Sequence, residues 1–100
     1  EEYFLQIVNK DNILFALLRL RIKGEEAFIR ELHVYGKSTA LGKRGKIQHR
    51  GLGKKLMKKA EEIVKKTEIK KLKVISGVGV REYYRKIGYK LEKEYMTKSI

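Results

Sequence analysis

Apolar residues change their spacing at Gly51, and this change constrains the fold more than any other feature of the chain. Before Gly51 they alternate every second residue, as in strands, and after it they recur every three or four residues, as in a helix. The predicted helix spans residues 51–66, and its apolar stripe consists of Leu52, Leu56, Ala60, Ile63 and Val64. Its other side, expected to face water, consists of Lys54, Lys55, Lys58, Glu61, Glu62 and Lys65.

Three strands are predicted before the helix, over residues 3–8, 13–22 and 27–35. The turn cluster 9–12 separates the first two, and Lys23-Gly24-Glu25 separates the second from the third. Such short connections predict an antiparallel meander. Alternation in the third strand places Phe28, Arg30, Leu32 and Val34 on one side, and Ile29, Glu31, His33 and Tyr35 on the other.

A strand over 72–75, a second helix over 80–87 and one or two closing strands within 89–100 are predicted after the helix. Gly77 and Gly79 interrupt the strand, and Gly88 is expected to cap the second helix. The predicted fold is α+β: one domain over residues 1–100, with a mixed central sheet flanked by helices. The helix at 51–66 is expected to connect two parallel strands.

The chain carries 25 basic against 12 acidic residues, a net charge of +13. This excess indicates a polyanionic partner such as RNA, DNA or a phosphate-rich cofactor, although a lysine-rich solvated surface is the simpler interpretation. There is no cysteine, which excludes a disulfide framework and a cysteine-held zinc site or iron–sulfur cluster. No apolar run is long enough to span a membrane, and a cytoplasmic setting fits. The start at Glu1, without an initiator Met, suggests a domain of a longer protein.

A candidate phosphate site lies in the segment Gln48-His49-Arg50-Gly51-Leu52-Gly53-Lys54, where a glycine pair opens the predicted helix. Glycines allow a ligand close to the backbone, and the free first-turn amides lie at the positive end of the helix dipole. The alternative is a glycine-rich turn that merely enters a helix. The spacing fits neither a P-loop nor a dinucleotide-binding fingerprint.

The same segment matches the Gln/Arg-x-x-Gly-x-Gly/Ala motif of the GNAT acetyltransferase superfamily. Two further blocks, Glu31-Leu32-His33-Val34-Tyr35-Gly36 and residues 74–89, resemble the acetyltransferase domain of the Elongator catalytic subunit, as found in archaea. The resemblance covers residues 27–96. It implies a GNAT fold that lacks the usual N-terminal strand and helices, with acetyl-coenzyme A as cofactor.

The resemblance also implies roles for individual residues. Glu31, Leu32, His33 and Val34 would line the acyl-pantetheine arm, and Leu52, Gly53 and Lys54 would hold the pyrophosphate. Gln48, Arg50 and Gly51 would be further cofactor contacts. Tyr84 would reach the cofactor near its sulfur and protonate the departing thiolate, with Tyr83 the next candidate. One of the two tyrosines is expected to pack while the other, Tyr84, faces the cleft. No metal site is expected.

The role of Glu31 and His33, which share a strand face, remains open. They are candidates for a general base or for positioning a water molecule; alternatively, Glu31 pairs with Arg19 or Arg21 and His33 only packs. His49 is interpreted as a loop or phosphate contact.

Full-length members of the resembled family modify wobble uridine 34 of tRNA, using acetyl-coenzyme A and a radical S-adenosylmethionine domain. That domain needs a cysteine-held iron–sulfur cluster, so the cluster and S-adenosylmethionine are expected only in the missing domain. Transfer RNA would bind through the basic surface. One alternative is a basic RNA-binding module without catalysis, supported by the lysines of segments 37–46, 54–59 and 65–73. The other is a fragment that only folds and self-associates.

Overall fold

The computed structural model describes residues 1–35 and 51–100. In this part of the chain, six strands form one mixed sheet in the order β1-β2-β3-β4-β6-β5. The strands are β1 (Glu2–Val8), β2 (Leu14–Lys23), β3 (Glu26–Val34), β4 (Lys71–Val74), β5 (Lys90–Glu92) and β6 (Tyr95–Ser99). The helices are α2 (Leu52–Lys65), the 3-10 turn η2 (Val78–Val80) and α3 (Arg81–Lys86). None of the described helices has the length and apolar character needed to cross a bilayer.

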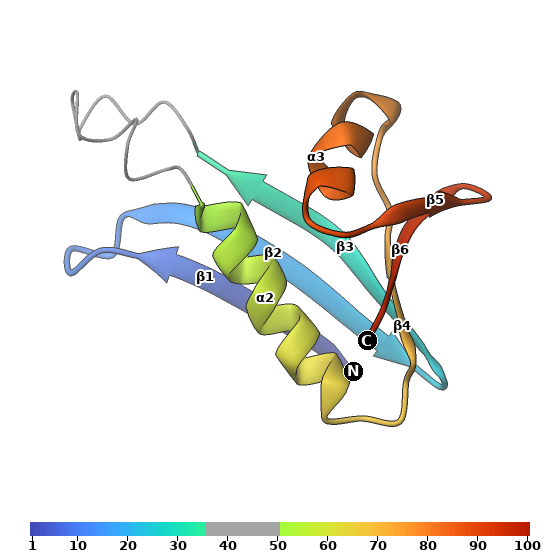
Figure 1. Ribbon diagram of the computed structural model, residues 1–100. Coiled ribbons are helices and arrows are strands. Elements are labelled where there is room, and N and C mark those ends of the chain that lie inside the picture. Colours follow the sequence, from blue (N-terminus) through green and yellow to red (C-terminus); the bar gives the residue numbers. More distant parts are fainter. Residues whose placement is uncertain (36–50) are drawn as a thin grey trace.

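The predicted meander and crossover are both confirmed. Strands β1, β2 and β3 pair antiparallel, and β4 pairs with β3 in parallel, so α2 lies in the connection between two parallel strands. The turns form as expected: Gly24 has a φ of 61°, and the Asn9 carboxamide oxygen accepts hydrogen bonds from the amides of Asp11 and Ile13. Figure 1 shows α2 lying across β1 to β3, with α3 beside the β5–β6 hairpin.

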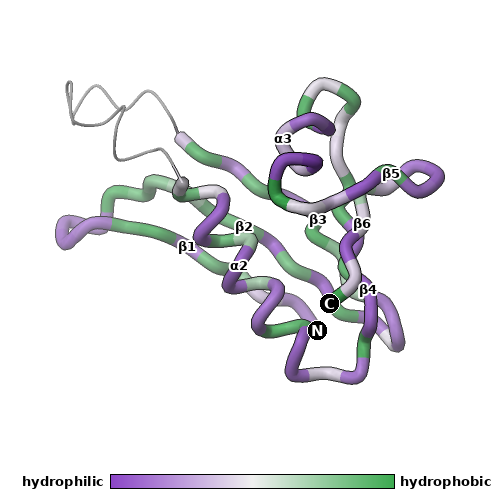
Figure 2. The backbone as a smooth tube through the Cα atoms, viewed as in Figure 1, coloured by the Kyte–Doolittle hydropathy of each residue, from purple (hydrophilic) through white to green (hydrophobic). Residues whose placement is uncertain are grey.

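The core lies between the sheet and the two helices. Strand β2 contributes every second residue, and the fully buried members are Ala16, Leu18 and Leu20. From α2, the buried residues are Gly53, Leu56, Met57, Ala60 and Val64. Three of them belong to the predicted stripe, whose other members, Leu52 and Ile63, are partly buried, and Gly53 and Met57 are additional. Figure 2 shows the apolar stretches of β1 and β2 behind α2, whereas the β1–β2 and β5–β6 turns are hydrophilic.

The predicted alternation in β3 is wrong at its centre. Arg19 pairs with Glu31 but Leu20 pairs with Ile29, so Arg30 is an extra residue, a β-bulge. The bulge shifts the side-chain pattern by one position. Ala27 and Ile29 are therefore buried in the same core against which Leu32 and Val34 pack, and Ile29 does not share a face with Glu31 and His33.

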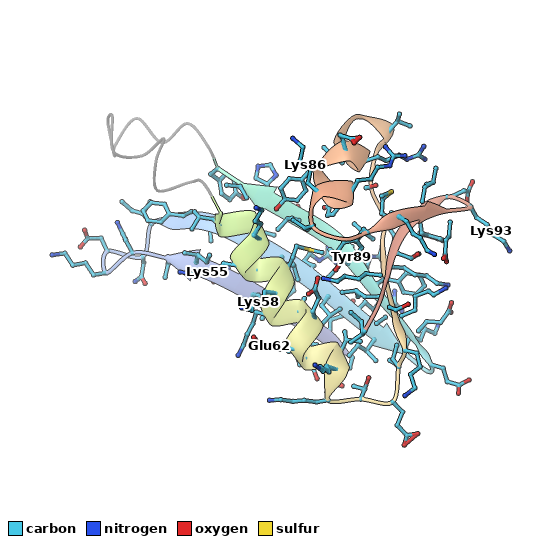
Figure 3. The ribbon with its side chains drawn as sticks, viewed as in Figure 1. Lys55, Lys58, Glu62, Lys86, Tyr89 and Lys93 are labelled. Carbon is cyan, nitrogen blue, oxygen red and sulfur yellow. The ribbon has the colours of Figure 1, made fainter. Side chains whose placement is uncertain are left out.

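Glu61 was predicted to face water, but its carboxylate instead accepts hydrogen bonds from side chains on the other side of the core. One of its carboxylate oxygens accepts a hydrogen bond from the Tyr89 hydroxyl at 2.6 Å, and the other from the Lys98 ammonium at 3.3 Å. Tyr89 lies between α2 and the β5–β6 hairpin, whereas Lys55, Lys58 and Glu62 project from the outer side of α2 (Figure 3). This polar contact connects α2 to β6.

Gly88 ends α3 in the left-handed region, with a φ of 101°. The amides of Gly88 and Tyr89 donate hydrogen bonds to the carbonyls of Arg85 and Tyr84, and the Tyr84 and Tyr89 rings meet edge to face. Two such bonds with an apolar contact make a Schellman cap, which confirms the predicted role of Gly88.

Gly88→Ala is therefore expected to lower the free energy of unfolding by about 1–2 kcal/mol, because a Cβ is disfavoured in this conformation. The added Cβ would also approach Lys98 Cε at 3.4 Å. Gly79→Ala is the matched control, since no atom lies within 4 Å of its Cβ position. Urea unfolding of both variants measures the difference, and equal losses would contradict the assignment.

Candidate active site

A groove of about 410 Å³ opens where β3 and β4 separate. The two strands pair only from Ala27 to Ile29 and from Leu72 to Val74, after which β3 continues to Val34 paired with β2 but not with β4. The start of α2 and the η2–α3 segment close the resulting gap from the helix side. The groove is lined by Leu32, Val34, Gly51, Gly53, Lys54, Val80, Tyr83 and Tyr84.

The N-terminus of α2 opens onto this groove without a side-chain cap. Gly51 occupies the N-cap position with a φ of 81°, and its carbonyl accepts the first helical hydrogen bond, from the Lys55 amide at 2.9 Å. In the described part of the chain no side chain caps this end, and the first turn contains no acidic residue. No described side chain therefore occupies the first-turn amides, which lie at the positive end of the helix dipole, where an anion is favoured.

Gly53 is buried against Tyr83, which explains why a glycine stands there. A Cβ added to Gly53 would overlap the Tyr83 hydroxyl and would lie 3.6 Å from a Val34 methyl. The Tyr83 hydroxyl is itself buried and has no hydrogen-bond partner among the described residues. A buried polar group of this kind costs free energy unless it is satisfied, so this hydroxyl requires a partner beyond the described residues.

Tyr84 also lines the groove and is only 6% exposed. Its ring meets those of Tyr83 and Tyr89 edge to face, with centroids 5.1 and 6.0 Å away, which fixes its orientation. Burial, with a smaller contribution from Tyr83, raises the pKa of Tyr84 to about 12. Burial also raises the pKa of Tyr83. Both tyrosines line the groove, whereas only one was expected to do so.

These buried tyrosines predict a loss of stability at alkaline pH. Burial and the hydrogen bond to Glu61 also raise the pKa of Tyr89. The ordinary pKa of tyrosine is 10, so above pH 10 the unfolded chain loses its tyrosine hydroxyl protons before the folded chain does. The free energy of unfolding should then fall as pH rises, by up to about 1.4 kcal/mol per pH unit for each group. Urea unfolding of wild type and Tyr89→Phe from pH 8 upward checks this, and equal slopes above pH 10 would contradict it.

Glu31 and His33 lie on the face of β3 opposite the side chains of Leu32 and Val34. Glu31 forms an ion pair with Arg19 at 3.6 Å, which is one of the two pairings predicted for it. His33 is exposed, and its ring contacts that of Tyr35 with centroids 4.3 Å apart. Neither side chain lines the groove, so their predicted cofactor contacts remain a prediction.

The predicted contacts Gln48, His49 and Arg50 lie outside the described residues, as does the basic segment 37–46. Among the described site residues, the sequence interpretation missed Val80, which begins the predicted second helix and lines the groove. It also missed the connection into α3, where Ser76 Oγ and Arg81 Nε are buried without a hydrogen-bond partner in the described chain. The flanking glycines Gly77 and Gly79 were the available signal.

A family model described as "Acetyltransferase (GNAT) domain" matches residues 2–98. The chain belongs to the GNAT acetyltransferase family. A solved structure of PaiA N-acetyltransferase from Thermoplasma acidophilum, in complex with coenzyme A, shares the fold with a TM-score of 0.75 at 23% identity. The match covers 100% of this chain and 62% of the PaiA chain.

Within this family, the resemblance to the Elongator catalytic subunit is confirmed. Elongator complex protein 3 of Drosophila melanogaster is 47% identical over 91% of this chain, and the tRNA uridine(34) acetyltransferase of Dehalococcoides mccartyi is 40% identical over 100%. A solved structure of the archaeal Methanocaldococcus infernus Elp3 matches this chain at 40% identity with a TM-score of 0.81. The match covers 100% of this chain and 29% of the Elp3 chain. This chain spans 19% and 25% of the two curated relatives.

Proposed function

We propose that this chain binds acetyl-coenzyme A in the groove between β3, α2 and α3 and serves as an acetyltransferase domain. The observation that carries the proposal is the N-terminus of α2, which no described side chain caps and which opens onto the groove beside Lys54. Backbone amides at a positive helix end suit a pyrophosphate. Residues Gly51 to Lys54 would hold it, with Gln48 and Arg50 as further contacts, and the strand from Glu31 to Val34 would accept the acyl-pantetheine arm.

When bound, acetyl-coenzyme A supplies an acetyl group activated as a thioester. We assign Tyr84 the role of proton donor to the leaving thiol, with Tyr83 the next candidate. Two observations support this assignment. The pKa of Tyr84, raised to about 12, keeps its hydroxyl protonated at neutral pH, and edge-to-face contacts with the rings of Tyr83 and Tyr89 orient it. A protonated, oriented hydroxyl is what a general acid requires.

We further propose that the chain is one domain of a longer archaeal, cytoplasmic protein that modifies wobble uridine 34 of tRNA. The names of its relatives support this substrate. The radical S-adenosylmethionine domain, with its iron–sulfur cluster, would be supplied by the rest of that protein, since this chain contains no cysteine. The net charge of +13 suits a polyanionic substrate such as tRNA.

Isothermal titration with acetyl-coenzyme A tests the cofactor proposal. We expect saturable heat from the wild-type chain and none from Gly53→Glu, whose carboxylate would place a negative charge at the phosphate site. Gly79→Glu is the control for charge and should bind as wild type. Absence of heat at millimolar ligand, from a protein shown by circular dichroism to be folded, would overturn the proposal. Binding of tRNA alone would then favour the RNA-binding module.

A further inference from the structure

Both helices pack on one face of the sheet, and no helix of the described residues covers the other. The core formed by α2, α3 and the sheet takes Ala16, Leu18 and Leu20 from β2, so the intervening residues point to the opposite side. Large side chains are exposed on that side, among them Phe4 at 63% and Ile75 at 48%. We call this surface the open face.

A hollow of about 340 Å³ lies near the centre of the open face, around Phe28. Phe28 stands between Arg21 on β2 and Lys73 on β4, its register partners, and its ring lies 5.9 Å from that of Tyr95. The Lys73 ammonium lies over both rings, at 5.5 and 5.6 Å from their centroids. This Phe28 hollow is lined by Arg21, Lys23, Glu26, Phe28, Arg30, Ile75 and Tyr95.

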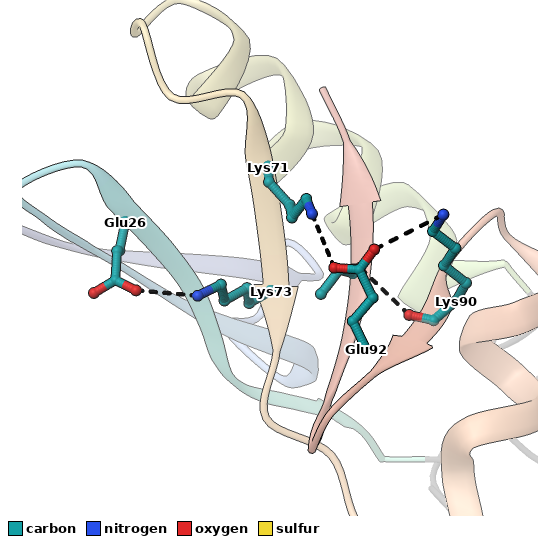
Figure 4. Close-up of polar contacts among 6 residues, drawn as sticks. Glu26, Lys71, Lys73, Lys90 and Glu92 are labelled. Carbon is teal, nitrogen blue, oxygen red and sulfur yellow. Dashed lines mark hydrogen bonds and ion pairs between the residues drawn. The ribbon is translucent and has the colours of Figure 1, made fainter.

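The Phe28 hollow is strongly basic. Its one acidic residue, Glu26, is neutralised by Lys73, whose ammonium lies 3.0 Å from the carboxylate (Figure 4). Arg21, Lys23 and Arg30 have no ion pair with any described residue. Arg30 reaches this surface because the bulge in β3 adds it as an unpaired residue next to Arg21 and Phe28. Three unpaired cations therefore surround two aromatic rings.

We propose that the Phe28 hollow binds a single-stranded segment of RNA, with a base stacked on Phe28 and Tyr95 and phosphates held by Arg21, Lys23 and Arg30. Aromatic rings within a basic groove are the recurring means of holding unpaired nucleotides. A protein partner fits less well, because the centres of protein interfaces are depleted in charge, whereas nucleic-acid interfaces are strongly positive. The inference deepens the proposed function, on which it rests for the choice of RNA as ligand.

Fluorescence anisotropy with a labelled single-stranded oligoribonucleotide of roughly ten nucleotides tests the proposal. The first variant is Arg21→Gln/Lys23→Gln/Arg30→Gln. Its charge-matched control is Lys55→Gln/Lys58→Gln/Lys65→Gln, on the outer side of α2, where each lysine is exposed. A third variant, Tyr95→Leu, removes one stacking surface while keeping an apolar side chain.

We expect the open-face triple variant to lose about tenfold or more in RNA affinity. The slope of its log affinity against log salt concentration should be shallower by about 2. The α2 triple variant should change far less in both quantities. Tyr95→Leu should weaken binding about tenfold without changing the salt dependence. Equal losses in the two triple variants would mean that charge alone attracts RNA, which overturns the proposal. A wild-type chain that binds acetyl-coenzyme A but no RNA would also overturn the proposal and would leave the cofactor proposal standing.

Discussion

Gly53→Ala should weaken acetyl-coenzyme A binding by about tenfold or more and also destabilise the fold, although alanine favours helices over glycine. Alanine in place of glycine within a helix contributes about 0.5–1 kcal/mol of stability. Here the new Cβ would overlap the Tyr83 hydroxyl, and overpacking of this kind costs about 1–3 kcal/mol. The clash therefore dominates, and relieving it requires Tyr83 to move within the groove that the cofactor would occupy. Calorimetry and urea unfolding measure the two effects.

Tyr83→Phe is expected to rescue the stability of Gly53→Ala. Without the hydroxyl, the added Cβ would have its nearest neighbours at 3.4 Å, the ring carbon Cζ, and 3.6 Å, the Val34 methyl. The intrinsic helix preference should then decide the sign, so that Gly53→Ala becomes neutral or stabilising in the Tyr83→Phe background. The double-mutant cycle should give a coupling energy of about 1–3 kcal/mol. Additive effects would show that the hydroxyl is not what excludes a side chain at position 53.

Tyr84→Phe should lower the rate of acetyl transfer or hydrolysis by about 10²–10⁴-fold, because it removes the proposed proton donor. The affinity for acetyl-coenzyme A should change little, since the ring remains in place. Release of free thiol from acetyl-coenzyme A in the presence of tRNA provides the rate. Because the pKa of Tyr84 is raised to about 12, the wild-type rate should not fall through loss of this proton between pH 7 and 10.

Tyr3→Phe, on the edge strand β1, is the matched control for removing a tyrosine hydroxyl and should react as wild type. Comparison with Tyr83→Phe ranks the two tyrosines of the groove. A larger rate loss in Tyr83→Phe would transfer the role of proton donor to Tyr83, whose hydroxyl is buried and has no hydrogen-bond partner in the described ranges 1–35 and 51–100. Unchanged rates in both variants would exclude a tyrosine acid.

Local signals were sufficient to predict most of the fold. Positive φ values at Gly24, Gly51 and Gly88 occur where the sequence predicted a turn, a helix start and a helix end. Their common physical basis is that only glycine adopts this conformation without strain. The apolar stripe of α2 was likewise predictable, because it depends only on the spacing of residues along one helix.

Features that depend on two distant segments were not predictable in the same way. The bulge at Arg30 is defined by the register between β2 and β3, and no residue type requires it, so alternation gave the wrong face for Ile29. Glu61 looked solvent-exposed on its own helix, but Tyr89 and Lys98 come to it from 28 and 37 residues away. The contact between Gly53 and Tyr83, which shapes the groove, also joins two segments distant in the sequence and was not predictable from either one alone.

The most direct test of this account is an amide nuclear magnetic resonance titration of the wild-type chain. Acetyl-coenzyme A should shift the backbone amide signals of Gly51, Leu52, Gly53 and Lys54 more than those of the outer side of α2. Acetyl-pantetheine, which lacks the pyrophosphate, should leave these four signals in place while still shifting those of Leu32 and Val34. If acetyl-coenzyme A bound and the four amides did not respond, the N-terminus of α2 would not be the phosphate site, and the central claim would be wrong.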